Sequence, residues 1–242
     1  MSKLRIAILS YRSAPFGGGQ GVYIKDISYA LSIMGHKIDV ISGPPYPNLA
    51  KQVKLIKLPG LDLFQTFLFK ERLKIFFSKK NKKVIDCYEF LSTLLGGFPE
   101  MRTFGFRAKN HLKNNDYDII IDNQSLSYGV LDLQKENPLI EIIHHPITKD
   151  YEHELETNNK FLYKLSRHRW YSFLKMQKKV APKLQTIVTP SVNSLKDIAA
   201  DFHCDPKKIT VINNGLDVDI FIPHNNIERR KFRLITLSLI HI

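Results

Sequence analysis

Cysteine, tryptophan and acidic residues are scarce in this sequence. Its 242 residues include 2 cysteines, 1 tryptophan and 23 Asp and Glu, against 36 Lys and Arg. Cys87 and Cys204 stand far apart, with no CxxC pair and no His/Cys ligand spacing. The sequence therefore predicts neither a disulfide framework nor a zinc site, and we expect both cysteines to be buried, reduced thiols.

Long hydrophobic runs are also absent. No uninterrupted apolar stretch approaches the roughly 18–20 residues that cross a bilayer, and the first apolar run, residues 6–9, is too short for the core of a signal peptide. We therefore expect a cytoplasmic protein. A hydrophobic fraction of 43% with 24% charged residues is typical of a globular chain with a sizeable core, and excludes a disordered or collagen-like polymer.

The excess of basic residues gives the chain a formal net charge of +13. Such a charge favours an anionic partner, which is a nucleic acid, an acidic membrane surface or a phosphorylated substrate. The charge is concentrated in two stretches: residues 70–83 carry seven bases and one acid, Glu71, and residues 160–183 carry eight bases and no acid.

The apolar pattern predicts a strand, a glycine-rich loop, a helix and a second strand at the start of the chain. Residues 4–9 are β-branched and apolar, apolar residues recur at helical spacing over 22–34 before Gly35, and residues 37–42 form the next apolar run. This order is that of a βαβ unit.

The same alternation continues along the chain. Further strands are predicted at 118–122, 139–143, 186–189 and 209–212, and helices at 63–77, 102–112, 161–181 and 191–202. We therefore expect an α/β fold with a parallel, doubly wound, Rossmann-like sheet that occupies residues 1–222.

A glycine cluster, Gly17-Gly18-Gly19-Gln20-Gly21, follows the first predicted strand. Free backbone N–H groups and the dipole of the next helix attract anions at such a position. The dinucleotide fingerprint fails because Val22 stands where it needs glycine, and the P-loop ending is missing. The glycines serve either a phosphate site or a tight turn with close helix packing, and their place at the carboxyl end of a strand favours a site.

Two adjacent histidines, His144 and His145, follow the predicted strand at 139–143 and belong to the same edge of the sheet. A histidine there can hydrogen-bond a sugar or move a proton near neutral pH, and the alternative is a strand-terminal histidine that bonds backbone. Metal binding by the pair is disfavoured, because adjacent side chains diverge from an extended backbone. Asn123, at the end of the strand 118–122, is a further candidate on the acceptor side.

Five segments follow one another in a characteristic order: Gly18-Gly19 with residues 23–27, then residues 34–40, 142–146, 188–191, and 209–217 with 221–223. They are a Gly-Gly loop with its helix, a Gly-His strand, a strand before histidine, a strand before serine, and a segment that precedes a hinge. Together they resemble the retaining glycosyltransferases of family 4, which have the two-domain GT-B fold. Asn213 stands where the family often has proline.

This resemblance implies a nucleotide-sugar donor held mostly by a second domain, and an acceptor held mostly by this one. The acceptor is a glycan, a lipid-linked sugar or a small molecule, and transfer in the cleft retains the anomeric configuration without a metal or other cofactor. His144 is implied as the catalytic residue beside the donor sugar. The implied substrate-binding residues are Gly18, Gly19, Gln20, Asn123, His145 and Ser191, and the implied interdomain hinge contains Asn214, Gly215 and Asp217.

The stretch 63–83 interleaves aromatic residues with its bases, a composition suited to an amphipathic helix on an anionic bilayer. This interpretation makes the protein peripheral on the inner face of the plasma membrane. The alternative is an aromatic stripe that faces the core, with a solvated lysine face. For the second basic stretch, the broad apolar face of residues 161–181 favours packing on the sheet.

Two other functions compete with sugar transfer. A basic nucleic-acid-binding module would explain the charge, but the sequence contains no zinc-finger spacing, no RNP-like motif and no helix-turn-helix, so we expect no nucleic-acid partner. A GT-B sugar-nucleotide epimerase would need carboxylates in the cleft, which the sequence does not locate.

The sequence changes character after residue 212, where residues 213–215 read as a turn. We expect residues 223–236 to form a hinge and the first strand of a second domain. The last six residues, 237–242, read like a translation of the transposon adaptor used in sequencing libraries, so we expect a non-native tail. A chain without the donor-binding domain is expected to be inactive by itself.

Overall fold

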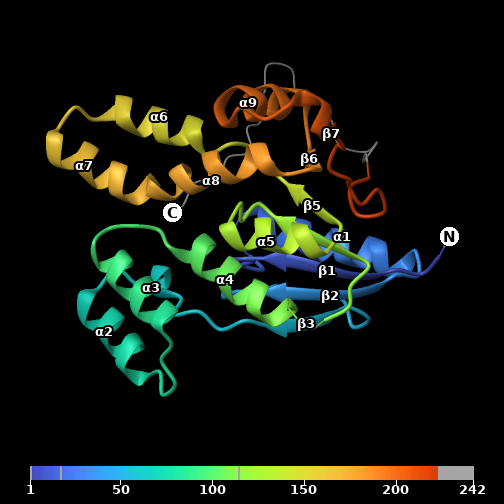
Figure 1. The fold of residues 1–242 in the computed structure, drawn as a ribbon, viewed down its shortest axis with the longest axis horizontal. Helices are drawn as coiled ribbons and strands as arrows, with labels where there is room; N and C mark the ends of the chain where they lie inside the picture. Colours follow the sequence, from blue (N-terminus) through green and yellow to red (C-terminus); the bar gives the residue numbers. More distant parts are fainter. Residues whose placement is uncertain (1, 17, 114, 223–242) are drawn as a thin grey trace.

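A parallel sheet of seven strands, in the order β3-β2-β1-β4-β5-β6-β7, runs through the molecule (Figure 1). The computed structural model describes residues 2–16, 18–113 and 115–222; the hinge and strand expected at 223–236 and the tail expected at 237–242 lie outside them. The strands are β1 (Arg5–Ser10), β2 (Lys37–Ser42), β3 (Lys54–Lys57), β4 (Ile119–Asn123), β5 (Leu139–Ile142), β6 (Ile187–Thr189) and β7 (Ile209–Val211). The order 3-2-1-4-5 is that of a doubly wound sheet, which confirms the predicted fold class.

β1 is an interior strand and is buried on both faces. It pairs with β2 on one side and β4 on the other, so that Ile8 aligns with Val40 and with Ile121. Because successive side chains point to opposite faces, Ile6 and Ile8 belong to one apolar cluster, and Ala7 and Leu9 belong to another.

Helices cover both faces of the sheet. They are α1 (Gly19–Ile33), α2 (Phe69–Ser78), α3 (Val84–Leu94), α4 (Glu100–Leu112), α5 (Tyr128–Glu136), α6 (Thr148–Thr157), α7 (Phe161–Trp170), α8 (Leu174–Val180) and α9 (Val192–Phe202). In Figure 1, α4 and α5 lie in front of the strands and α1 lies behind them. The cluster with Ile6 and Ile8 includes Ile24 of α1, whereas the cluster with Ala7 and Leu9 includes side chains of α4, α5, α8 and α9.

The helices α2 and α3 form a small layer beyond the end of the sheet, at the lower left of Figure 1. Their own apolar cluster contains Leu61, Leu63 and Phe90, with Phe76 stacked on Phe90 at 4.2 Å between ring centroids. α2 itself has no buried residue. The elements that follow β2 and β3 therefore build a wall along the carboxyl edge of the sheet.

Two long helices predicted from the sequence are interrupted. The helix expected at 63–77 is a 3-10 turn, Leu63–Gln65, and then α2, because Thr66 is extended and its Oγ1 accepts the Leu68 N–H at 3.2 Å. The helix expected at 161–181 is divided into α7 and α8 by a 3-10 turn, Tyr171–Phe173. α8 packs into the core as expected, but α7 has no buried residue.

Several elements have no counterpart in the sequence prediction. β3, α5 and α6 were not predicted, because they are short or mostly polar. α3 was not predicted either, although most of its residues are apolar. Cys204 is buried and Cys87 is half-buried, so the expectation of two buried thiols is wrong for Cys87. No described helix is both long and apolar enough to span a bilayer.

Candidate functional site

The candidate site lies at the carboxyl edge of the sheet, where β1 and β4 are neighbours. The chain leaves β1 toward β2 and leaves β4 toward β5, so the connections diverge and leave a crevice between them. Ligands of doubly wound sheets bind at such a point. The loop before α1, the end of β4 and the segment after β5 all reach this crevice.

The glycine loop combines an exposed backbone with a tight contact. Gly18 precedes α1 with a φ of 84°, a conformation that favours glycine, and a Cβ at Gly18 or Gly19 would meet no atom within 4 Å. A Cβ at Gly21, in contrast, would lie 2.1 Å from the carbonyl oxygen of Ala14. Close packing therefore explains Gly21, while Gly18 and Gly19 leave the start of α1 open to a ligand. Gly17 lies outside the described residues.

His144 contacts two of the neighbouring elements. Its Nε2 lies 2.9 Å from Oδ1 of Asn123 at the end of β4, and the ring of Tyr23, from α1, meets the imidazole edge-on at 4.7 Å between centroids. With Oδ1 as the acceptor, Nε2 carries the proton and Nδ1 is the unprotonated nitrogen. Burial, and secondarily the charge of His145, lower the pKa of His144 to about 4. The ring is therefore neutral at pH 7.

Asn123 is fully buried, and its Nδ2 donor has no hydrogen-bond partner within the part of the chain that the structure describes. A buried donor without an acceptor costs free energy, and such groups gather where a ligand completes the bonding. Asn123 and His144 are thus brought together as the sequence predicted.

Gln124 fixes the backbone of both histidines. Its Oε1 accepts the His144 N–H at 3.0 Å, and its Nε2 donates to the His145 carbonyl at 2.8 Å. Gln124 itself has a φ of 58° and Leu126 has a φ of 46°, so two left-handed residues turn the chain sharply after β4. The position of His144 therefore depends on a strained turn.

Two buried carboxyl groups, Asp122 and Glu141, support this turn. Asp122 Oδ2 accepts the Ser125 N–H at 2.8 Å, and Glu141 Oε1 accepts the Leu126 N–H at 3.3 Å. Burial raises the pKa of Asp122. Burial, and then the neighbouring Asp122 charge, raise the pKa of Glu141 well above its ordinary value.

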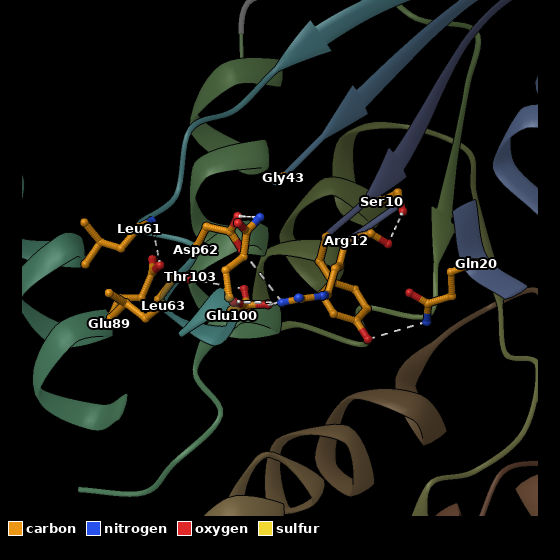
Figure 2. Close-up of polar contacts among 12 residues, drawn as sticks. Ser10, Arg12, Gln20, Gly43, Leu61, Asp62, Leu63, Glu89, Glu100 and Thr103 are labelled. Atoms are coloured by element: carbon orange, nitrogen blue, oxygen red, sulfur yellow. Dashed lines mark hydrogen bonds and ion pairs between the residues drawn. The ribbon is translucent and has the colours of Figure 1, made fainter. Parts of the chain in front are cut away.

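A second polar cluster lies farther along the same edge, as Figure 2 shows. Arg12, from the loop after β1, is 3.0 Å from Oε2 of Glu100 and 3.9 Å from Oδ1 of Asp62. Burial raises the pKa of Glu100 to about 7, although Arg12 opposes this shift. Glu89, the third carboxylate, accepts the Leu61 N–H at 2.8 Å. Carboxylates that the sequence did not locate are therefore present at the edge, paired with arginine or backbone.

Gln20 links the glycine loop to this second cluster. Its Nε2 donates to the hydroxyl of Tyr11 at 3.4 Å (Figure 2). Tyr11 and Glu100 line the same small pocket. Gln20 therefore contacts the second polar cluster, and its role toward a substrate stays a prediction.

The remaining predicted site residues lie elsewhere. His145 is 58% exposed and its Nε2 is 3.5 Å from Asp150, and Ser191 caps α9 by accepting the Ser194 N–H at 3.0 Å. The expected hinge residues Asn214, Gly215 and Asp217 are exposed after β7. Their roles stay predictions. Within residues 2–16, 18–113 and 115–222, no group of three or more His, Cys, Asp or Glu side chains is arranged to hold a metal ion.

Several residues of the site were not singled out from the sequence, among them Arg12, Tyr23, Glu100 and Gln124. Gln124 carried a usable signal, because it extends a run of polar residues directly after an apolar strand. Arg12 and Glu100 are 88 residues apart, and nothing local indicates their pairing.

The comparisons with known proteins agree with this architecture. The family model described as Glycosyltransferase Family 4 matches residues 17–220. MMP α-(1→4)-mannosyltransferase of Mycolicibacterium hassiacum is 40% identical over 239 residues, which are 97% of this chain and 57% of that protein. The chain therefore spans little more than half the length of this curated relative.

Solved structures show the same fold at low sequence identity. Sucrose-phosphate synthase from Thermosynechococcus elongatus has a TM-score of 0.58 at 15% identity, covering 92% of this chain and 51% of that one. WaaG, a glycosyltransferase involved in lipopolysaccharide biosynthesis, has a TM-score of 0.54 at 16% identity. The match covers 88% of this chain and 46% of that one.

Proposed function

Because this chain belongs to glycosyltransferase family 4, we propose that residues 1–222 are the acceptor-side half of an enzyme that transfers a sugar from a nucleotide-sugar donor to an acceptor. The observation that carries the proposal is the family match over residues 17–220, together with a polar site at the switch point of the sheet. The donor is held mainly by a second domain, and the reaction occurs in the cleft between the two.

We assign His144 to the reacting centre. With a pKa of about 4, the imidazole is uncharged at neutral pH. It therefore does not act as a half-protonated acid–base group there; its unprotonated Nδ1 positions the donor sugar by accepting a hydrogen bond from a sugar hydroxyl. Asn123 and Tyr23 hold the ring, and Gln124 holds its backbone.

The glycine loop serves the phosphate side of the donor. The start of α1 presents N–H groups beside Gly18 and Gly19, where the absence of Cβ atoms allows close approach of a diphosphate. Gln20 borders this approach. His145 and Ser191 are proposed as outer contacts of the substrates, and Asn214, Gly215 and Asp217 as the hinge.

The 40% identity to a mannosyltransferase supports a mannosyl donor, an α-(1→4) linkage and a carbohydrate acceptor. Retention of configuration is proposed from family membership. An α-linked product formed from an α-configured nucleotide-mannose would support retention, and a β-linked product would contradict it. Proton NMR of the anomeric signal distinguishes the two.

The test of His144 uses the completed two-domain protein with GDP-mannose and an α-mannose oligosaccharide. We expect His144→Ala to reduce transfer by at least about a hundredfold, the low end for a polar catalytic group. His145→Ala is the matched control, because its exposed side chain faces Asp150, and we expect a milder effect. Near-normal transfer by a folded His144→Ala protein would contradict the assignment.

An epimerase of the same fold is the alternative function. It needs carboxylates in its cleft, and Asp62, Glu89 and Glu100 lie at this edge of the sheet. In this chain they are held by Arg12, Arg107 and backbone N–H groups, which favours a structural role. An epimerase would convert the nucleotide sugar without an acceptor, whereas a transferase requires one. Chromatography of the nucleotide sugar with and without acceptor separates the two functions.

We also propose that the stretch 63–83 docks on an anionic membrane from the cytoplasmic side. Leu63, Leu73 and Phe76 pack inward, as the aromatic-stripe interpretation requires. Other apolar side chains of this stretch are exposed: Phe67, Leu68, Phe69 and Phe77. Exposed aromatics interspersed with lysines are suited to an anionic bilayer surface.

A further inference from the structure

A cavity of about 470 Å³ lies outside the site described above, beside the edge strand β3. Its wall is formed by the residues after β3, the loop between α2 and α3, the first turn of α3, and one face of α4. The lining residues are Leu58, Pro59, Lys79, Asn81, Lys83, Ile85, Asp86, Phe106, Arg107, Asn110 and His111. This volume is within the roughly 300–1,000 Å³ of small-molecule sites.

The lining carries more positive than negative charge. Three of its side chains are permanent cations, Lys79, Lys83 and Arg107, and one is a carboxylate, Asp86. Asp86 is already saturated: its Oδ1 is 2.8 Å from Lys79 and 2.7 Å from Arg107, and its Oδ2 accepts the Lys83 N–H at 2.8 Å. The uncompensated charge therefore belongs to Lys83, which forms no ion pair with any described residue.

The pairing of Asp86 also fixes the wall. Burial alone would raise the pKa of Asp86, but hydrogen bonds from Lys79, the Lys83 N–H and Arg107 outweigh burial and lower it. The carboxylate stays ionised and holds Lys79 and Arg107 in place. Arg107 is only 14% exposed and also contacts Glu89 at 2.5 Å, so its guanidinium is held rigidly between two carboxylates.

The uncharged part of the lining is suited to a sugar. Phe106 is 48% exposed and offers an aromatic face, and Asn81 and Asn110 offer amide donors and acceptors. A few polar groups on a partly apolar surface are the usual composition of a small-molecule site. An anion that carries no sugar ring would leave the aromatic face of Phe106 exposed to solvent.

We propose that this cavity binds a phosphorylated sugar, with the phosphate at Lys83 and the sugar ring against Phe106. The proposal goes beyond the transferase reaction and does not depend on it, because binding here needs neither a donor nor the cleft. The same chemistry is offered by a free sugar phosphate and by the inositol phosphate headgroup of a lipid.

Calorimetric titration of the chain with glucose 6-phosphate and with inorganic phosphate tests the site. We expect saturable binding of glucose 6-phosphate that Lys83→Glu weakens at least about tenfold, the loss typical of one charge-assisted hydrogen bond. Lys80→Glu is the control with the same change of charge, because Lys80 is exposed and does not line the cavity. Phe106→Ala should weaken glucose 6-phosphate and leave inorganic phosphate unchanged.

A second arm identifies the source of the ligand. Co-sedimentation compares phosphatidylcholine vesicles that contain phosphatidylinositol with vesicles of equal charge that contain phosphatidylserine. A preference for phosphatidylinositol that is lost in Lys83→Glu but kept in Lys80→Glu detects a headgroup ligand and supports the proposal equally. Equal weakening of glucose 6-phosphate binding by the two lysine variants would show diffuse electrostatic attraction and overturn the site. Absence of saturable binding in both arms, with a folded protein by circular dichroism, would also overturn it.

Discussion

Asp122 and Glu141 stand directly opposite each other in the register of β4 and β5, with both carboxyl groups fully buried. Their side chains lie on the same face of the sheet, and Asp122 Oδ1 and Glu141 Oε2 have no hydrogen-bond partner in the described ranges. Two carboxyl groups in contact cannot both be ionised at low cost, so the pair holds a proton. This proton lies beneath the turn that positions His144.

Replacement of Glu141 by glutamine should make stability less dependent on pH. The pKa of folded Glu141 is raised well above 4.5, so the stability contributed by its protonated form is present below that value and is lost as the pH rises through the folded pKa. Glu141→Gln keeps a neutral group there. We expect urea unfolding to show a smaller loss of stability as the pH rises from 4.5 than in the unchanged protein, whereas Glu136→Gln, on the surface, should behave like the unchanged protein. Parallel pH profiles for all three would rule out the shared proton.

The pKa of His144 can be moved by its neighbour. Because the folded pKa is lowered from 6.5 to about 4, the neutral ring contributes stability above pH 6.5 that is lost as the pH falls toward 4. Asn123→Asp places a carboxylate beside Nε2 and should raise the pKa of His144, since an opposite charge favours the imidazolium. NMR titration of the ring measures this shift. Asn137→Asp, remote from the ring, should leave it unchanged.

Two glycines only two residues apart should differ in their tolerance of alanine. Gly21→Ala drives a Cβ to within 2.1 Å of the Ala14 carbonyl oxygen, and we expect a loss of at least about 1–3 kcal/mol in the free energy of unfolding. Gly19→Ala meets open space at the first position of α1 and should leave stability unchanged or slightly higher. Denaturant unfolding of both variants gives the comparison. If both lose stability equally, the contact with Ala14 is not the cause.

Membrane docking should be lost when lysines near α2 are reversed in charge, and kept when lysines on α8 are reversed. Lys70, Lys74 and Lys80 are exposed near the apolar side chains of α2, and each base is worth about 1 kcal/mol near an anionic surface. Their joint reversal to glutamate should release the protein from phosphatidylserine vesicles in a co-sedimentation assay. Reversal of Lys175, Lys178 and Lys179 on α8 changes the net charge equally and should have little effect. If both triple variants are released alike, or if neither is, the docking surface is not α2.

Most strands of the sheet could be predicted, because each depends on a short run of consecutive residues. The apolar runs of β1, β2, β4 and β5 are each bounded by glycine or polar residues, and a strand buried on both faces requires such a run. β3 was missed because lysines occupy both ends of its four residues. An edge strand needs less apolar surface, so its pattern is weaker.

The site was predictable only where polar residues directly follow strands. Asn123 and His144 meet this condition, and the parallel register of β4 and β5 brings them together. The pairing of Arg12 with Glu100 depends on the packing of α4 beside β1, which no local pattern records. The break at Thr66 depends on one side-chain hydrogen bond that competes with the helix.

The interior position of β1, between β2 and β4, has a consequence for synthesis. The first hydrogen bond to its β4 side joins Arg5 to Asp118, which are 113 residues apart. At about 5–20 residues per second, a ribosome needs roughly 6 to 23 seconds to make that separation. During this interval β1 has only β2 as a partner, and its other side has unpaired N–H and C=O groups. This interior strand of the finished sheet is therefore an edge strand of the nascent chain, exposed to chaperones and to other chains until β4 emerges.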